Sequence, residues 1–216
     1  MLKTVIFDMD GVIIDSEPIH HDAFFKVFDD LNIEVSELYY DSLKGFSTKN
    51  AMQRIVDDFQ LNNESVAELV ERKRSYFNDL FDTKADLRLI PGVFSLIQDL
   101  HQKGLQLILA SSSAKVTIDR IFRRFELYPY FTHIISGEEF PQSKPNPAIF
   151  LRAQELSQHS KQECIVIEDS TNGILAAHRA EIFCIAYKSE NSHNQDLSLA
   201  DAVIDDFEEI ERILHN

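Results

Sequence analysis

The sequence has little of several residue types, and each scarcity excludes a class of protein. Among 216 residues there is no Trp, and there are two Cys, six Gly and six Pro. The two cysteines, Cys164 and Cys184, lie in apolar runs without metal-ligand spacing, which favours buried reduced thiols over a disulfide or a zinc site. No apolar run approaches the ~20 residues that span a bilayer, and acidic residues come too early for a signal peptide. We therefore expect a cytoplasmic protein with no membrane partner.

Positive charge is scarce as well. The chain has 21 Lys and Arg residues against 36 Asp and Glu residues, which gives a formal net charge of −15. Such a surface repels nucleic acids and anionic lipids, so neither is expected as a partner. Hydrophobic residues make up 44% of the chain, which is ample for a packed core in one domain or a core domain with a small insert. An acidic protein that handles phosphate must neutralise its own field locally, which predicts a metal ion.

Short apolar runs alternate with amphipathic stretches from about residue 87 onward. This part of the sequence predicts helices over 93–100, 116–125 and 148–156. Together with the N-terminal run, it predicts strands over 4–7, 105–110, 133–135, 164–167 and 182–186. Strand–helix alternation of this kind predicts an α/β fold with a doubly wound, Rossmann-like parallel sheet.

Residues 17–84 break this rhythm, because they contain helical patterns and no clear strand. The strongest pattern covers 66–81, after the capping candidate Asn63, and another covers 47–59. The sequence therefore predicts a core domain of residues 1–16 and 85–216 with a small helical cap, residues 17–84, inserted after the first strand. An insert at that point overhangs the carboxyl edge of the sheet, where open α/β folds bind ligands.

Two pairs of acids directly follow two of the predicted strands. Asp8 and Asp10 come after the first strand, and Glu168 and Asp169 come after the fourth. A D-x-D-G sequence alone also fits an Asp-rich turn, but parallel strands end along one rim, so the four carboxylates can converge there. Carboxylates this close repel one another without a cation, and a hard oxygen site suits octahedral Mg²⁺. These four residues are therefore the predicted magnesium site.

A serine and a lysine are expected at the same rim. Ser111 follows the strand predicted over 105–110, so its hydroxyl and the nearby backbone N–H groups face this edge. Lys144 is followed by Pro145 and stands just before a predicted helix, where prolines stiffen the backbone. A lone lysine is usually solvated, but one placed in this way is a candidate for a fixed cation near phosphate.

These segments, in this order, resemble the four motifs of the haloacid dehalogenase (HAD) superfamily. The matching residues are Asp8-Met9-Asp10-Gly11-Val12, Ser111, Lys144 and Glu168-Asp169. Residues 15–18 and the helical insert resemble the subgroup with a small helical cap, which includes β-phosphoglucomutase and many sugar-phosphate phosphatases. The resemblance covers essentially the whole chain. Each motif alone is weak, but four in order and register are strong.

The resemblance implies a role for each of these residues. Asp8 would be the nucleophile that forms an aspartyl-phosphate, and Asp10 the general acid and base, with a pKa raised by burial under a closed cap. Ser111 would hold a phosphate oxygen, and Lys144 would offset the repulsion between two anions. The second acid of the first motif, Asp10, also argues against a dehalogenase.

The resemblance further implies how Mg²⁺ is bound. The ligands would be Asp8, the backbone carbonyl of Asp10 and Asp169, with Glu168 bound directly or through water.

Hydrolysis and phosphoryl transfer within a sugar are the two reactions to separate. Residues 43–47 resemble the cap loop that reads the substrate in the phosphoglucomutase branch, and His20 stands where that branch has a histidine near the acid/base. However, Thr48 stands where the mutase has an arginine for the second phosphate, and 113–115 lacks its Lys-Asn pair. Nearby Lys49 is an imperfect substitute.

We therefore expect a Mg²⁺-dependent phosphatase for a small phosphorylated metabolite, such as a sugar phosphate, that acts as a monomer. A hexose phosphomutase of the β-phosphoglucomutase type is the alternative, and a non-catalytic regulator that binds a phosphometabolite is a further one. An intact nucleophile and acid argue against the regulator. Substrate contacts are expected from His20, Lys44, Thr48, Lys49, Lys73 and Ser112.

Overall fold

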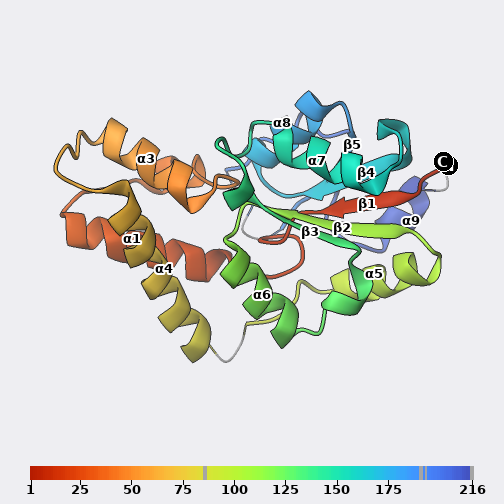
Figure 1. Cartoon of the computed structure of the whole chain (residues 1–216), viewed down its shortest axis with the longest axis horizontal. Coiled ribbons are helices and arrows are strands. Elements are labelled where there is room, and N and C mark those ends of the chain that lie inside the picture. Colours follow the sequence, from red (N-terminus) through yellow and green to blue (C-terminus); the bar gives the residue numbers. More distant parts are fainter. Residues whose placement is uncertain (85–86, 190–191, 193, 215–216) are drawn as a thin grey trace.

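The computed structural model describes residues 1–84, 87–189, 192 and 194–214. These residues form a parallel sheet of six strands in the order β3-β2-β1-β4-β5-β6. The strands are β1 (Thr4–Phe7), β2 (Gln106–Ser111), β3 (His133–Ser136), β4 (Cys164–Glu168), β5 (Phe183–Tyr187) and β6 (Ala202–Ile204). With helices on both faces of the sheet, the predicted doubly wound, Rossmann-like α/β fold is confirmed (Figure 1).

Strand β6 was not predicted. It has three residues, and Val203 at its centre is 50% exposed. Because aspartates flank it at positions 201 and 205, the local sequence is typical of a polar loop. Its pairing with β5, from Ile185 opposite Ala202 onward, is what makes it a strand.

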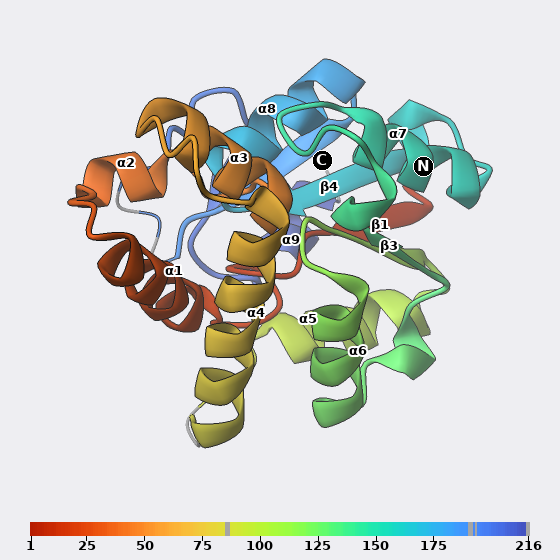
Figure 2. The same cartoon turned by 60° about the vertical axis from the view of Figure 1, so that its left-hand side comes forward.

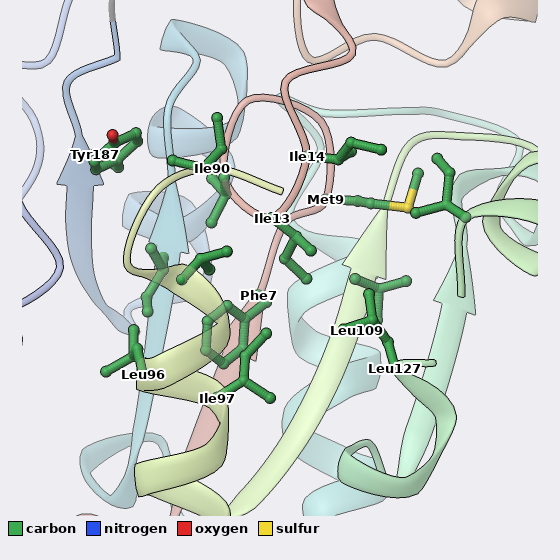
Figure 3. Close-up of a cluster of buried hydrophobic side chains, with 14 of the residues drawn as sticks. Phe7, Met9, Ile13, Ile14, Ile90, Leu96, Ile97, Leu109, Leu127 and Tyr187 are labelled. Atoms are coloured by element: carbon green, nitrogen blue, oxygen red, sulfur yellow. The ribbon is translucent and has the colours of Figure 1, made fainter. Parts of the chain in front are cut away.

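The two faces of the sheet carry separate apolar layers. The core helices are α5 (Val93–Gln102), α6 (Lys115–Arg124), α7 (Ala148–Ser157), α8 (Thr171–Ala180) and α9 (Glu209–Leu214). Successive side chains of a strand point to opposite faces, so Phe7 packs in the layer with α5, α6 and α9, and Ile6 in the layer with α7 and α8. Figure 3 shows the first layer, with Phe7 against Leu96 and Ile97 of α5.

The cap region has an apolar cluster of its own. Its helices are α1 (Glu17–Leu31), α2 (Glu37–Asp41), α3 (Thr48–Asp58) and α4 (Val66–Thr83). The cluster includes Phe24, Val27, Phe28, Met52, Ile55 and Leu69. The predicted cap of α4 was wrong: Ser65, not Asn63, precedes the first helical residue, and its Oγ accepts a hydrogen bond from the Glu68 N–H. The domain boundaries at 16/17 and 84/85 stay a prediction.

The cap lies beyond the carboxyl ends of the strands (Figures 1 and 2). An antiparallel bridge between Ile14 and Leu89 joins the segment that leaves the sheet to the segment that returns to it.

Both Cys164 and Cys184 are buried free thiols, as predicted. None of the helices described is long and apolar enough to cross a bilayer.

Candidate active site

Lys144 is a buried cation that links two of the predicted acids. Its Nζ donates hydrogen bonds to Asp8 Oδ1 at 2.5 Å, to Glu168 Oε1 at 2.8 Å and to the Ala110 carbonyl at 3.1 Å. The side chain is 1% exposed. Burial lowers the pKa of Lys144, but the carboxylates of Asp8 and Glu168 raise it more, so the pKa lies above its usual range. The two carboxylates therefore favour the ammonium form of Lys144 at the strand ends.

Glu168 holds the loop that follows β4. Its Oε2 accepts hydrogen bonds from the Asp169 N–H at 2.8 Å, from the Ser170 N–H at 2.8 Å and from Ser170 Oγ at 3.0 Å. A Cβ at position 173 would lie 1.7 Å from Glu168 Oε1, so the first turn of α8 needs Gly173 there. Protein donors therefore already engage both carboxylate oxygens of Glu168.

Nearby positive charge does not offset the burial and mutual repulsion of the Asp8 and Asp169 carboxylates. Burial raises the pKa of Asp8 to about 7 against the opposing effect of Lys144, and two nearby carboxylates add to the rise. Burial also raises the pKa of Asp169 well above its usual range, and Glu168 and Asp8 add to that effect. Among the described residues, the Asp169 carboxylate accepts no side-chain or backbone hydrogen bond. Asp8 is buried and Asp169 is half-buried, and the lysine next to them is already paired, so a cation would stabilise both carboxylates.

The donor set fits Mg²⁺ chemically. A Cβ at Gly11, whose φ is +82°, would lie 2.0 Å from Asp169 Oδ2, so the glycine of the first motif allows Asp169 to approach this segment. Within the described ranges, no three His, Cys, Asp or Glu side chains are already grouped as a metal site. Carboxylate and carbonyl oxygens are nevertheless the ligands that Mg²⁺ prefers.

Asp10 has a hydrogen-bond network separate from that of Asp8. Oδ1 accepts from Ser16 Oγ at 2.5 Å and lies 3.2 Å from His20 Nε2, while Oδ2 accepts from Ser113 Oγ at 2.6 Å. The expected rise in the pKa of Asp10 was wrong. Burial raises this pKa, but the facing His20 and the hydrogen bonds lower it more, to below its usual range. The sequence indicated burial and placed His20 near Asp10, but it did not indicate the two serine donors, and neither Ser16 nor Ser113 was predicted as a site residue.

Lys73 stands behind His20. Its Nζ lies 2.7 Å from His20 Nδ1, and the side chain is 3% exposed between the rings of Phe24 and Phe77, at 4.9 Å and 5.0 Å. Burial lowers the pKa of Lys73 to about 8. An ammonium that donates to Nδ1 leaves the proton of a neutral imidazole on Nε2, where it points at Asp10. Lys73 therefore reaches Asp10 through His20.

Three consecutive serines, the first of which is the last residue of β2, contact different parts of the molecule. Ser111 is fully buried, and its Oγ accepts a hydrogen bond from the Ser113 N–H at 3.0 Å. Ser112 Oγ donates to the carbonyl of Gly45 in the cap at 2.7 Å. Ser111 thus shapes the loop from within, whereas Ser112 contacts the cap.

Two adjoining cavities separate the cap from the core. The inner cavity, about 80 Å³, is lined by the acids and by cap residues that include Asp8, Asp10, Asp169, His20, Lys44, Thr48, Ser112 and Ser113. The outer chamber, about 610 Å³, shares His20, Thr48, Ser112 and Ser113 with it and adds Lys49, Lys73 and Arg74. The ammonium of Lys44 is paired with Glu17 at 3.3 Å and with Asp41 at 2.8 Å. All six predicted substrate contacts therefore line one cavity or both.

Comparison with known proteins identifies the family. Residues 5–187 match the model of the family described as haloacid dehalogenase-like hydrolase. The chain belongs to this family, as its four motifs predicted.

The relatives include both a mutase and a phosphatase. β-Phosphoglucomutase of Bacillus subtilis (strain 168) is 30% identical over 188 residues, which cover 85% of this chain and 82% of the relative. The phosphorylated carbohydrates phosphatase of Thermotoga maritima is 28% identical over 184 residues, with 84% and 82% covered. The crystal structure of β-phosphoglucomutase from Clostridium difficile superposes with a TM-score of 0.85 at 28% identity and covers 98% of this chain and 96% of that one.

Proposed function

We propose that the protein is a Mg²⁺-dependent phosphatase that hydrolyses a small phosphate monoester through an aspartyl-phosphate on Asp8. The observation that carries this proposal is the pair of neighbouring carboxylates in contrasting environments. Asp8 is paired with Lys144, whereas Asp10 is held by two serines and His20. Two acids with distinct surroundings can divide the roles of nucleophile and proton carrier.

The chemistry has two displacements at phosphorus. In the first, an Asp8 carboxylate oxygen attacks phosphorus, the ester P–O bond breaks, and Asp10 gives its proton to the leaving alkoxide. In the second, Asp10 takes a proton from water, whose oxygen attacks the phosphoryl group, and the bond to Asp8 breaks to release phosphate. The arriving phosphate anion would raise the pKa of Asp10 by like-charge repulsion, so Asp10 can carry the proton that the first step needs.

Mg²⁺ would be held by Asp8, Asp169 and the backbone carbonyl of Asp10. When bound, it would neutralise charge on the phosphoryl oxygens. Because protein donors occupy the oxygens of Glu168, that residue would meet the ion through water. Lys144 would place a second positive charge beside the attacking carboxylate, and Ser111 would order the loop around the phosphate.

The substrate would be a small phosphorylated metabolite, and a sugar phosphate fits best. The named relatives act on phosphorylated carbohydrates or are called phosphoglucomutases. The inner cavity has room for little more than a phosphoryl group, so the alcohol would extend toward the outer chamber. A monomer in the cytoplasm remains our prediction.

A phosphomutase is the second candidate, because β-phosphoglucomutase is 30% identical to this chain. A mutase must hold a second phosphate while the sugar turns over. Thr48, where the mutase has an arginine, lines both cavities here and offers a hydroxyl instead. Hydrolysis is therefore the favoured reaction.

The test is phosphate release from a panel of small monoesters with Mg²⁺, with EDTA, and with Asp8→Asn. The matched control is Asp99→Asn, the same change at an exposed site on α5. Release that is lost with EDTA and with Asp8→Asn, but kept by Asp99→Asn, would support the proposal. Conversion of β-glucose 1-phosphate to glucose 6-phosphate with a bisphosphate primer, without release, would favour the mutase. Ligand binding with neither reaction would favour the regulator.

A further inference from the structure

The outer chamber is where the alcohol part of a monoester would lie, if the proposed function holds. It adjoins the inner cavity through four shared residues. Its walls come from α3 and α4 of the cap and from α6 and the turn Gly137–Glu139 after β3 in the core. Helices α4 and α6 lie side by side in both views of the molecule (Figures 1 and 2). A substrate with a second phosphate would place it in this chamber.

Two features of the chamber wall would attract such a phosphate. One is the guanidinium of Arg74 on α4. The other is the N-terminus of α6, whose N-cap residue, Ala114, has no side chain that can cap the helix. Together they offer a planar cation and a free helix end, which are the groups that commonly bind phosphate.

A single carboxylate already occupies both features. Glu138 Oε1 lies 2.9 Å from Arg74 Nη2, and Glu138 Oε2 accepts a hydrogen bond from the Lys115 N–H at 3.0 Å. Arg74 Nη1 is paired with Glu71 at 2.9 Å as well. The guanidinium is thus balanced by two carboxylates, and the free end of α6 is capped by Glu138.

The position of Glu138 is fixed by its own turn. The Glu138 N–H donates to Ser136 Oγ at 3.2 Å, and Glu139 closes a capping box with Ser136. A Cβ at Gly137 would lie 2.9 Å from the Cα of Ser112, so the turn packs directly on the loop that lines both cavities. The hydrogen bonds and packing of this turn therefore fix the backbone that carries the Glu138 carboxylate.

The other cations of the chamber do not replace Arg74. Lys73 is buried and contacts His20, so its charge is directed toward Asp10. Lys49 is an exposed single ammonium. We propose that Glu138 is a specificity-determining residue that holds the place of a second phosphate and so restricts the enzyme to monophosphorylated substrates.

The test measures binding of glucose 6-phosphate and glucose 1,6-bisphosphate by calorimetry, in the Asp8→Asn background with Mg²⁺. Adding Glu138→Gln removes the negative charge but keeps an oxygen that can accept from the Lys115 N–H. Both groups of the ion pair are partly exposed, Arg74 by 28% and Glu138 by 43%, so we expect a moderate effect. The preference for the bisphosphate over the monophosphate should rise about five- to tenfold.

Two further variants keep the result interpretable. Arg74→Met added to Glu138→Gln should abolish the gain, because the freed guanidinium is the group that would bind the second phosphate. Glu155→Gln, the same change in an exposed ion pair with Arg152 on α7, lies outside the chamber lining and should leave the ratio unchanged.

An unchanged ratio in Glu138→Gln, including failure of both ligands to bind, would overturn the proposal. Tight preference for the bisphosphate with Glu138 intact would overturn it as well. Because the assay uses binding without turnover, failure of the proposed phosphatase activity is detected separately, by the absence of phosphate release from the unmodified protein.

Discussion

The inner cavity and the outer chamber hold their charges in different ways. Asp8 lines the inner cavity and is paired with Lys144, which also pairs with Glu168. The side chains of Lys144 and Glu168 are each 1% exposed, whereas in the chamber Arg74 and Glu138 are 28% and 43% exposed. Charges interact strongly where water is excluded and weakly where it screens them. The comparison teaches that the groups proposed for phosphoryl chemistry are held by buried ion pairs, whereas the groups proposed to select the substrate can change at little cost in stability.

The largest expected effect is on catalysis in the inner cavity. Asp8→Asn should lower kcat by about 10⁴-fold or more, because it removes the nucleophile. The side chain keeps its size, so the melting temperature should stay within a few degrees, which calorimetry can measure. Residual activity within tenfold of the unmodified protein would show that another residue is the nucleophile.

Lys144→Met should cause the largest loss of stability. It leaves Asp8 and Glu168 buried without their shared cation, so the free energy of unfolding should fall by about 3–5 kcal/mol. Urea denaturation measures this change. The control is Lys161→Met, which breaks an exposed pair with Glu181 and should cost less than about 1 kcal/mol. Equal losses for the two variants would remove the contrast between buried and exposed charges.

Lys73→Met tests whether Lys73 acts on Asp10 through His20, the residue between them that lines both cavities. We expect kcat to fall about 10–100-fold, because His20 loses the donor that orients its ring toward Asp10.

The same variant gives a pH-dependent signal. The pKa of Lys73 is about 8 in the folded protein against 10.5 as its ordinary value, so the unfolded chain binds more protons between these two pH values. The unmodified protein should therefore gain about 2 kcal/mol of stability over Lys73→Met as pH rises from 8 to 10. Denaturation of both proteins at the two pH values measures the difference. A constant difference would mean that Lys73 is not destabilised by burial.

Glu138→Gln should have the smallest effect on the fold. The free energy of unfolding should change by less than about 1 kcal/mol, since the ion pair with Arg74 is partly solvated and the Lys115 N–H keeps an acceptor. Urea denaturation beside Lys144→Met makes the comparison direct. A loss as large as that of Lys144→Met would assign Glu138 a structural role instead of a selective one.

The fold could be predicted from the sequence wherever the pattern was regular. Long apolar runs such as β4 and the helical period of α4 placed both elements within one or two residues. Strand β6 is set by its pairing with β5, and its three residues are too few for an alternating pattern. The cap of α4 was misplaced because two polar residues, Asn63 and Ser65, compete for that role within one turn.

The site was predictable where a residue stands in a motif and not where its role depends on tertiary contacts. Lys144 was expected from its prolines, and it meets Asp8 as the motif order implied. The low pKa of Asp10 depends first on His20, which the sequence placed near it, and then on Ser113 and Ser16. Ser113 comes from a different strand end, and no sequence pattern predicted its contact with Asp10. The role of Glu138 could not be predicted from the sequence either, because its partner Arg74 is far away in the chain.

The central claim is that the phosphoryl group passes through Asp8, and trapping it there is the most direct test. The protein and its best monophosphate would be mixed with Mg²⁺, quenched in acid, and mapped by peptide mass spectrometry. We predict a phosphoryl group on Asp8. It should accumulate further when Asp10→Asn is given acetyl phosphate, whose acetate leaving group needs no proton from Asp10, because the water is then no longer activated. Turnover by the unmodified protein with no phosphoryl group on Asp8 in either form would contradict the account.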